Sequence, residues 1–219
     1  MTVGLLGGTF DPPHRGHLDV AEAARKALAL DQVWLVPSRR PPHRIPPVAS
    51  AAHRFAMVAL AVAGQPGLRV CDADMDGEGL SYSIDTVRRV LTQHPEVADS
   101  LFFITGADAF LEIRTWHDWR QLLDLCHFVV VSRPGCSARR VRDVLPELGD
   151  RMHEVPCATT SAPGIFLIDA PTADVSSTRM REALRTSRTA PPLLPPQVAH
   201  YAARHGLYAE PATLESPRG

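Results

Sequence analysis

Hydrophobic residues along this chain gather in short runs, separated by longer segments with a helical repeat. The runs at residues 3–6 and 33–36 each stop at glycine or proline, a pattern that indicates buried β-strands. Segment 17–28 instead carries apolar residues four positions apart, which places them on one face of a helix. Further runs predict strands at residues 68–71, 101–104, 128–131 and 165–168.

Capping residues mark the ends of several predicted helices. Ser50 can cap the start of a helix that runs to Gly64. Ser83 can cap the start of another. Pro196 opens a terminal helix at residues 198–204. These signals place helices between the predicted strands and at the end of the chain.

Strands that alternate with helices predict a doubly wound α/β fold, in which a parallel sheet is covered on both faces. The 219 residues suffice for a single domain. We expect it to span residues 1–208 and to be followed by a flexible tail at 209–219, where little apolar content is available for burial. In such sheets ligands bind outside the carboxyl ends of the strands. Functional residues are therefore expected along one rim.

Charge and composition limit the classes of partner that the chain is expected to bind. The formal net charge is −1, so no overall field attracts the chain to nucleic acid or to a membrane, and we expect neither partner. Lys26 is the only lysine, which excludes a P-loop and leaves arginine, histidine and backbone N–H groups to bind phosphate. The four cysteines form no C-x-x-C pair, and the N-terminus lacks signal-peptide features. A cytoplasmic protein with reduced thiols is expected.

The first motif with chemical content covers residues 7–17, read as G-G-T-F-D-P-P-H-R-G-H. Its paired glycines follow a predicted strand and let the backbone approach a ligand closely. A helix is expected to begin near its end, where free N–H groups and the helix dipole favour an anion. His14 and His17 lie three positions apart and can project the same way. A phosphate chain would meet all of these donors together.

The histidine pair has two other interpretations. An H-x-x-H pair can bind a metal ion, but no third ligand is evident nearby and no second pair exists. Two histidines at a helix start can also form a polar cap and nothing more. The preceding strand and the paired glycines favour the phosphate site over both.

The second motif covers residues 174–181, read as D-V-S-S-T-R-M-R. Ser176 or Ser177 can cap the helix that follows, and Arg181 falls one turn into it. Hydroxyl groups, a helix N-terminus and an arginine together indicate a second anion site. Taken alone, the motif would more simply be a capped helix with a solvated arginine.

Residues 7–17 and 175–181 resemble the two signatures of the nucleotidylyltransferase superfamily, G-G-T-F-D-P-x-H-x-G-H and I-S-S-T-x-x-R. The segments between them resemble the bacterial nicotinate-nucleotide adenylyltransferase family in particular. That narrower resemblance rests on P-P-H-R at 41–44, S-Y-S-I-D-T at 81–86, G-A-D at 106–108, Trp116, and R-P-G at 133–135. It extends from about residue 3 to the L-L-P and G-L-Y segments at 193–195 and 206–208.

The resemblance implies a Rossmann-like nucleotidylyltransferase fold and a definite reaction. AMP would be transferred from ATP to the 5′-phosphate of nicotinate mononucleotide, giving nicotinate adenine dinucleotide and pyrophosphate in NAD biosynthesis. The phosphate would attack in line, without a covalent enzyme intermediate. Mg²⁺ would accompany ATP on its phosphates, with no ligand from protein side chains. The sequence leaves a homo-oligomer open.

The resemblance also implies roles for individual residues. The implied catalytic residues are His14, His17 and Arg181. The implied ATP-binding residues are these three and Gly7, Gly8, Thr9, Phe10, Gly106, Asp108, Ser176, Ser177 and Thr178. The implied mononucleotide-binding residues are His43, Arg44, Tyr82, Ser83, Thr86, Trp116 and Arg133. Within this last set, Trp116 would stack on the pyridine ring, and His43 or Arg44 would neutralise the phosphate together with Arg133.

Two of these residues have ordinary structural alternatives. Trp116 has polar neighbours, which fits a stacking platform, although a half-buried core tryptophan is the commoner case. Asp108 follows a strand and Gly106, which suits a contact to ribose hydroxyls as well as it suits a helix N-cap. Segment 136–164 matches no pattern that assigns it a role.

Competing functions make different demands on the sequence. The same fold can serve another acceptor, such as nicotinamide mononucleotide or phosphopantetheine, or act as a cytidylyltransferase. The R-P-G segment and Trp116 argue against the phosphopantetheine enzyme. A non-catalytic nucleotide sensor would be expected to have lost a histidine or the Ser-Ser-Thr segment, and both are present. A nicotinamide-dependent oxidoreductase would carry G-x-G-x-x-G at the first turn, where this chain has G-G-T-F.

Overall fold

The computed structural model describes residues 1–42, 45–76, 79–154, 162–186 and 191–209. Its centre is a seven-stranded sheet in which every pair of neighbouring strands is parallel. The strands are β1 Val3–Gly8, β2 Gln32–Pro37, β3 Leu68–Val70, β4 Leu101–Gly106, β5 His127–Val131, β6 Met152–Glu154 and β7 Ile165–Ile168. Their order across the sheet is β3-β2-β1-β4-β5-β7-β6.

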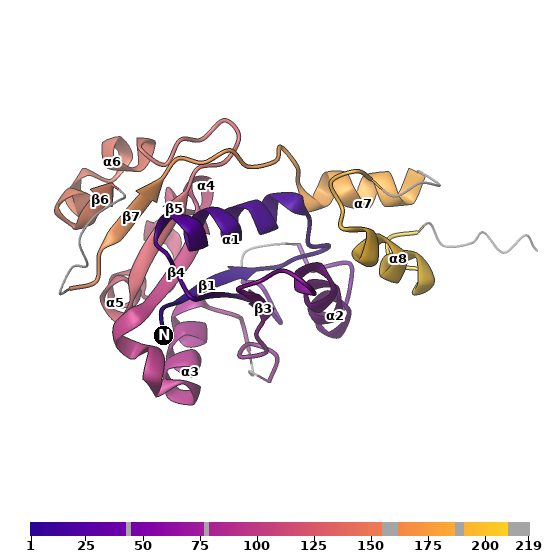
Figure 1. Ribbon diagram of the computed structural model, residues 1–219, viewed down its shortest axis with the longest axis horizontal. Coiled ribbons are helices and arrows are strands. Elements are labelled where there is room, and N and C mark those ends of the chain that lie inside the picture. The colour runs from indigo at the N-terminus through magenta and orange to yellow at the C-terminus, as the bar shows by residue number, and fades with distance from the viewer. Residues whose placement is uncertain (43–44, 77–78, 155–161, 187–190, 210–219) are drawn as a thin grey trace, which may run out of the picture.

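Helices cover both faces of the sheet (Figure 1). They are α1 Arg15–Ala27, α2 Ala51–Val62, α3 Ser83–Gln93, α4 Ala107–Phe110, α5 Trp119–Leu125, α6 Arg140–Val144, α7 Ser177–Thr186 and α8 Pro196–Arg204. Short 3-10 turns lie at Pro95–Ser100, Ile113–Thr115 and Pro146–Arg151. Among the described residues, no helix is long and apolar enough to cross a membrane.

Alternate residues of each strand enter one of two hydrophobic cores. In β1, Leu6 packs into the core under α1, α2, α7 and α8, whereas Leu5 packs into the core under α3, α4, α5 and α6. The two faces of β4 divide in the same way, with Ile104 on the first side and Phe103 on the second. A strand buried on both faces needs an almost continuous apolar run, which explains the runs in the sequence.

The predicted doubly wound parallel sheet is confirmed, with each predicted strand present. The edge strand β6 was not predicted, because its three residues carry no hydrophobic run. The helix caps were partly correct. Ser50 Oγ accepts a hydrogen bond from the His53 N–H at 3.3 Å, and Gly64 has a φ of +75° just beyond α2. Ser83 was wrong as a cap, since α3 begins at Ser83 and Tyr82 is the capping residue.

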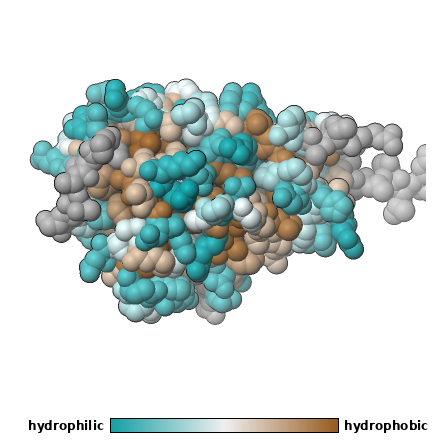
Figure 2. Space-filling model, viewed as in Figure 1, coloured by the Kyte–Doolittle hydropathy of each residue, from teal (hydrophilic) through white to brown (hydrophobic). Residues whose placement is uncertain are grey.

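The chain order reverses between β1 and β4, because β1 pairs with β2 on one side and with β4 on the other. The segments after β1 and β4 therefore leave neighbouring strands at the same rim, which is where doubly wound sheets bind ligands. Helix α1 crosses the face drawn in Figure 1, and hydrophilic side chains lie over it in Figure 2. The predicted tail falls almost wholly in residues 210–219, outside the described residues.

Candidate active site

The turn between β1 and α1 places the first motif at this rim. Gly8 lies against the ring of Phe10, and a Cβ on Gly8 would come within 2.9 Å of that ring. Phe10 has a φ of +50° and is 1% exposed, with its ring edge-on to His17 at 4.9 Å between centroids. The Phe10 side chain is therefore part of the support beneath the turn. Only its main chain is placed to meet the ATP that the resemblance assigns to it.

His14 and His17 stack on each other at the start of α1, with ring centroids 3.8 Å apart. The His14 N–H donates to Nδ1 of His17 at 3.2 Å, and the His17 N–H donates to the His14 carbonyl at 2.9 Å. The Nδ1 atom of His17 therefore helps to cap the start of α1, as the polar-cap interpretation expects. Because Nδ1 accepts, the proton of a neutral His17 ring sits on Nε2, which is the nitrogen that can donate to a phosphate.

His14 differs sharply from His17 in its surroundings. It is 1% exposed, and its Nδ1 has no hydrogen-bond partner among the described residues. Burial, together with the positive charge of Arg133, lowers the pKa of His14 to about 4. His14 is therefore neutral at physiological pH, and it contributes a dipole rather than a positive charge to the site.

The second motif, at the start of α7, contacts the turn after β1, although the two lie far apart in sequence. Ser177 Oγ donates to the Pro12 carbonyl at 3.0 Å, across 165 residues of chain. Arg181 donates from Nη1 to the Asp11 carbonyl at 2.7 Å and from Nη2 to Thr178 Oγ1 at 3.1 Å. Ser176 Oγ accepts from the Arg179 N–H at 3.3 Å, which confirms Ser176 as a cap of α7.

The turn after β4 and the segment after β5 close the same side of the site. A Cβ on Gly106 would lie 2.6 Å from the Asp108 carboxylate and 3.1 Å from the Arg133 side chain. A cavity of about 230 Å³ is lined by Asp108, Arg133, Pro134, Asp174, Val175, Ser176 and Arg179. Arg133 thus lies beside Asp108 and Ser176, which are predicted for ATP, and its predicted role toward the mononucleotide stays a prediction. The N-cap alternative for Asp108 was wrong, because Gly106 occupies the cap position of α4.

Tyr82 and Trp116, from the predicted mononucleotide group, lie on neighbouring segments. The Tyr82 ring packs on the ring of His117, with centroids 4.4 Å apart, so the Trp116 segment lies beside the start of α3. Trp116 is half-buried and packs edge-on against Phe103 at 6.0 Å. The half-buried core position of Trp116 is therefore confirmed, and stacking by the part of the residue that stays exposed remains a prediction.

Thr86 and Ser83, also predicted to bind the mononucleotide, lie on α3. Thr86 is buried, and its Oγ1 lies 3.2 Å from the Tyr82 carbonyl and 3.4 Å from the Asp74 carboxylate, both of which can accept its proton. A contact from Thr86 to a ligand would use its main chain or its acceptor lone pairs. Ser83 is half-buried at the first position of the helix. His43 and Arg44 lie outside the described residues.

Three buried charged residues support this rim, and the sequence interpretation gave none of them a role. Arg54 is 1% exposed and donates to the carbonyls of Thr9, Arg39 and Ala49. Asp74 is 2% exposed and pairs with Arg89 at 2.6 Å. The third, Asp11, is 3% exposed and accepts two backbone N–H groups. Their partners are too distant in sequence to be foreseen, and only the rarity of a charge on a buried helix face hinted at Arg54.

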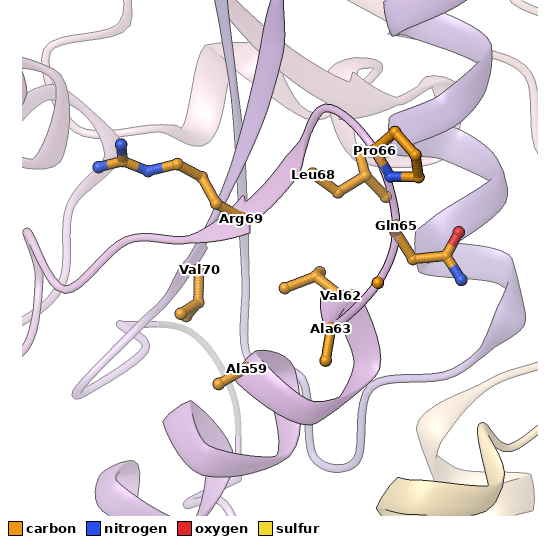
Figure 3. Close-up of a pocket in the computed structure, with 9 residues that line it drawn as sticks. Ala59, Val62, Ala63, Gln65, Pro66, Leu68, Arg69 and Val70 are labelled. Carbon is orange, nitrogen blue, oxygen red and sulfur yellow. The ribbon is translucent and has the colours of Figure 1, made fainter.

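A larger depression of about 520 Å³ lies elsewhere, between the end of α2 and the edge strand β3 (Figure 3). Ala59, Val62, Leu68 and Val70 line it, and none of the predicted site residues does. Arg69 extends away from it, and its guanidinium lies 4.2 Å from the centre of the Trp34 ring. Size alone would therefore select the wrong place, because the charged and polar groups converge at the other rim.

The fold and this site together define the class to which the protein belongs. Residues 5–183 match the family described as cytidylyltransferase-like. A relative from Moorella thermoacetica, named a probable nicotinate-nucleotide adenylyltransferase, is 43% identical over 94% of this chain and 91% of its own. One from Acidithiobacillus ferrooxidans with the same name is 39% identical over 94% and 95%. The chain belongs to the nicotinate-nucleotide adenylyltransferase family.

A solved structure agrees with the fold. The Plasmodium falciparum nicotinic acid mononucleotide adenylyltransferase, complexed with NaAD, superposes with a TM-score of 0.72. It covers 94% of this chain and 97% of that one at 17% sequence identity. At that identity the likeness shows a common fold, and the seven-stranded parallel sheet is the shared framework.

Proposed function

We propose that this protein transfers AMP from ATP to the 5′-phosphate of nicotinate mononucleotide, forming nicotinate adenine dinucleotide and releasing pyrophosphate. The observation that carries the proposal is the meeting of two phosphate-type motifs at the switch point of the sheet, where α7 bonds to the turn after β1. The names of relatives at 39–43% identity support the choice of acceptor.

The reaction needs positioning and charge stabilisation rather than a protein nucleophile. An oxygen of the mononucleotide phosphate attacks the α-phosphorus of ATP in line, the bond to the β-phosphate oxygen breaks, and pyrophosphate leaves. Negative charge then grows on the departing group, beside Arg181 and the start of α1. His17 donates from Nε2, and the N-terminal N–H groups of α1 and the Arg181 guanidinium complete the donor set. No covalent intermediate is required.

On the ATP side of the site, neutral His14 supports His17 and cationic Arg133 supplies positive charge. The low pKa of His14 keeps its ring uncharged. The ring can therefore stack under His17 without repelling the positively charged Arg133. Asp108 faces the cavity beside Arg133, and we assign its carboxylate to the ribose hydroxyls. Arg133, next to it, would then compensate phosphate charge.

Mg²⁺ fits this site as a companion of the triphosphate. Among the described residues, no group of three or more His, Cys, Asp and Glu side chains can hold a metal ion. Asp108 and Asp174 are the carboxylates that line the cavity. Phosphate oxygens, which are ligands that Mg²⁺ favours, would therefore supply much of its coordination. When bound, the ion would neutralise charge on the departing pyrophosphate.

The acceptor would lie between α3 and the segment before α5. We assign the exposed part of the Trp116 ring to stacking on pyridine, and we assign Tyr82 and Thr86, from the neighbouring start of α3, to the same mononucleotide. A cytoplasmic location stays a prediction; Cys71, Cys126 and Cys136 are free thiols in the part of the chain that the structure describes. Homo-oligomer formation stays a prediction, as does the absence of nucleic-acid and membrane partners.

The test is pyrophosphate release with ATP and Mg²⁺, run in parallel with three acceptors. We expect turnover with nicotinate mononucleotide at least about tenfold above nicotinamide mononucleotide, a preference of about 1.4 kcal/mol. Turnover with phosphopantetheine alone would keep the chemistry and overturn the acceptor. If a folded, ATP-binding protein released no pyrophosphate with any of the three acceptors, it would be a nucleotide sensor instead.

A further inference from the structure

The Asp11 carboxylate connects both motifs to the last described helix of the chain. Its Oδ2 accepts the Val48 N–H at 2.7 Å, and its Oδ1 accepts the Ala49 N–H at 3.1 Å. The Tyr208 hydroxyl donates to the same Oδ1 at 2.7 Å, from 197 residues away in sequence. Asp11 is thus a buried carboxylate that receives hydrogen bonds from a loop and from the C-terminal segment.

Arg181 stands beside this carboxylate without being captured by it. Its Nη1 is bonded to the Asp11 main-chain carbonyl at 2.7 Å, while the distance from Nη1 to Asp11 Oδ2 is 3.8 Å. The carboxylate oxygens are already occupied by the loop and by Tyr208. The guanidinium is consequently held at the site by a neutral carbonyl, and its charge stays available to a ligand.

Tyr208 is held in an unusual backbone conformation. It follows α8 with a φ of +68°, a region that bulky residues rarely adopt, and only 7% of it is exposed. Burial and the nearby Asp11 charge raise the pKa of its hydroxyl, so the group keeps its proton and remains a donor. A strained residue kept in place by a buried hydrogen bond suggests a functional constraint.

We propose that Tyr208 is a positioning residue for the departing pyrophosphate: its hydroxyl occupies Asp11 and thereby leaves Arg181 directed to the phosphate. Without the hydroxyl, the buried Asp11 Oδ1 loses the shorter of its two hydrogen bonds and keeps only the Ala49 N–H. The carboxylate then draws the Arg181 guanidinium from its present ion-pair distance of 3.8 Å into a closer, hydrogen-bonded pair. This inference rests on the role proposed above for Arg181.

Tyr208→Phe tests the proposal by removing one oxygen and keeping the ring. We expect the affinity for Mg²⁺-pyrophosphate, measured by calorimetry, to fall about five- to tenfold, the scale of one lost charge-assisted contact. The kcat of adenylyl transfer should fall, while the KM for the mononucleotide stays unchanged. Tyr201→Phe is the matched control, because the Tyr201 hydroxyl contacts His53 Nδ1 at 3.0 Å instead. It should leave pyrophosphate affinity and turnover as they are.

A double-mutant cycle separates positioning from a merely structural role. In an Arg181→Ala background, Tyr208→Phe should cause no further loss of pyrophosphate affinity, because the group it positions is gone. An equal loss in both backgrounds would overturn the proposal. So would an unchanged pyrophosphate affinity, even with a lower Tm.

The proposed function and this inference fail in different ways. A wild-type protein that binds pyrophosphate but does not use nicotinate mononucleotide would overturn the acceptor, and calorimetry on the variants would still decide the role of Tyr208. A wild-type protein that turns over its substrates but whose pyrophosphate affinity is insensitive to Arg181→Ala would overturn the inference alone.

Discussion

His14 and His17 share a motif and a stacking contact, yet their surroundings differ. His14 is fully buried and its pKa falls to about 4, below the ordinary value of 6.5. His17 is half-buried, and its Nδ1 accepts a hydrogen bond from the His14 backbone N–H. A sequence pattern that treats the two as equivalent phosphate donors therefore merges two roles. The first is a neutral ring that packs under the turn, and the second is the proposed donor to the ligand.

The low pKa of His14 makes the stability of the fold depend on pH. The unfolded chain binds this proton near pH 6.5 and the folded chain only near pH 4, so the stabilisation is complete above pH 6.5 and is lost as the pH falls toward 4. Linkage gives a loss of about 2 kcal/mol at pH 5 relative to pH 7. His14→Asn, which retains a good N-cap residue, should remove that part of the pH dependence in urea unfolding.

His200→Asn is the control for that measurement, because His200 is exposed on α8. Its unfolding free energy should keep the wild-type dependence on pH. An identical slope for the His14 and His200 variants would show that His14 titrates normally in the folded protein.

His17 is expected to matter for rate rather than for stability. Removing one preorganised donor to a developing oxyanion typically costs about 10²- to 10³-fold in rate. His17→Ala should therefore lower kcat by that order while its thermal unfolding stays close to wild type. Single-turnover kinetics with saturating ATP measure this directly. Wild-type turnover in the variant would remove His17 from the catalytic group.

At the level of elements, the turn from β4 into α4 depends on the absence of a side chain at Gly106. A Cβ there would lie 2.6 Å from Asp108 Oδ1 and 3.1 Å from Arg133 Cγ. Asp108 is exposed and can rotate away at little cost to the fold. Gly106→Ala should therefore displace the carboxylate and raise the KM for ATP about three- to tenfold, the value of one hydrogen bond.

Gly149→Ala is the matched control, since a Cβ at Gly149 meets nothing within 4 Å. Both variants should unfold near the wild-type temperature, and only Gly106→Ala should change the KM for ATP. An unaltered KM in Gly106→Ala would argue that Asp108 does not contact ATP.

The strands were predictable from the sequence because each is buried on both faces and reads as a run of apolar residues. Helices α1 and α2 are long enough to show a helical repeat and a cap. Helices α4, α5 and α6 have four to seven residues, too few for that repeat to be visible. The phosphate motifs were predictable because glycine, histidine and serine at a helix start have a local reason to be there.

The support beneath those motifs was not predictable, because its bonds span the chain. Arg54 reaches Thr9 across 45 residues and Tyr208 reaches Asp11 across 197. Nothing local in the sequence marks either contact. The placement of Arg133 beside Gly106 likewise depends on how β4 and β5 are paired.

At the scale of the whole molecule, one buried cation holds the rim together. Arg54 comes from α2 and donates to Thr9 after β1, to Arg39 after β2, and to Ala49 before its own helix. Burial lowers its pKa from the ordinary arginine value, while the nearby Asp11 opposes the shift. Three loops thereby share one guanidinium, in addition to the bonds from Val48 and Ala49 to Asp11.

Arg54→Met should therefore lower the unfolding free energy and loosen the site together. Each buried carbonyl left without a donor costs about 1–3 kcal/mol, so a loss of at least about 2 kcal/mol is expected in urea unfolding. Arg114→Met is the control, because Arg114 is half-exposed and pairs with Glu147 at the surface, where such pairs contribute below about 1 kcal/mol. The rise in Tm on adding ATP should also be smaller in Arg54→Met and unchanged in Arg114→Met. Arg54 holds the turn that we propose to bind the phosphates, whereas Arg114 does not contact it. Equal losses of stability in the two variants would mean that the loops around the site are held by their own contacts, and that Arg54 does not join them.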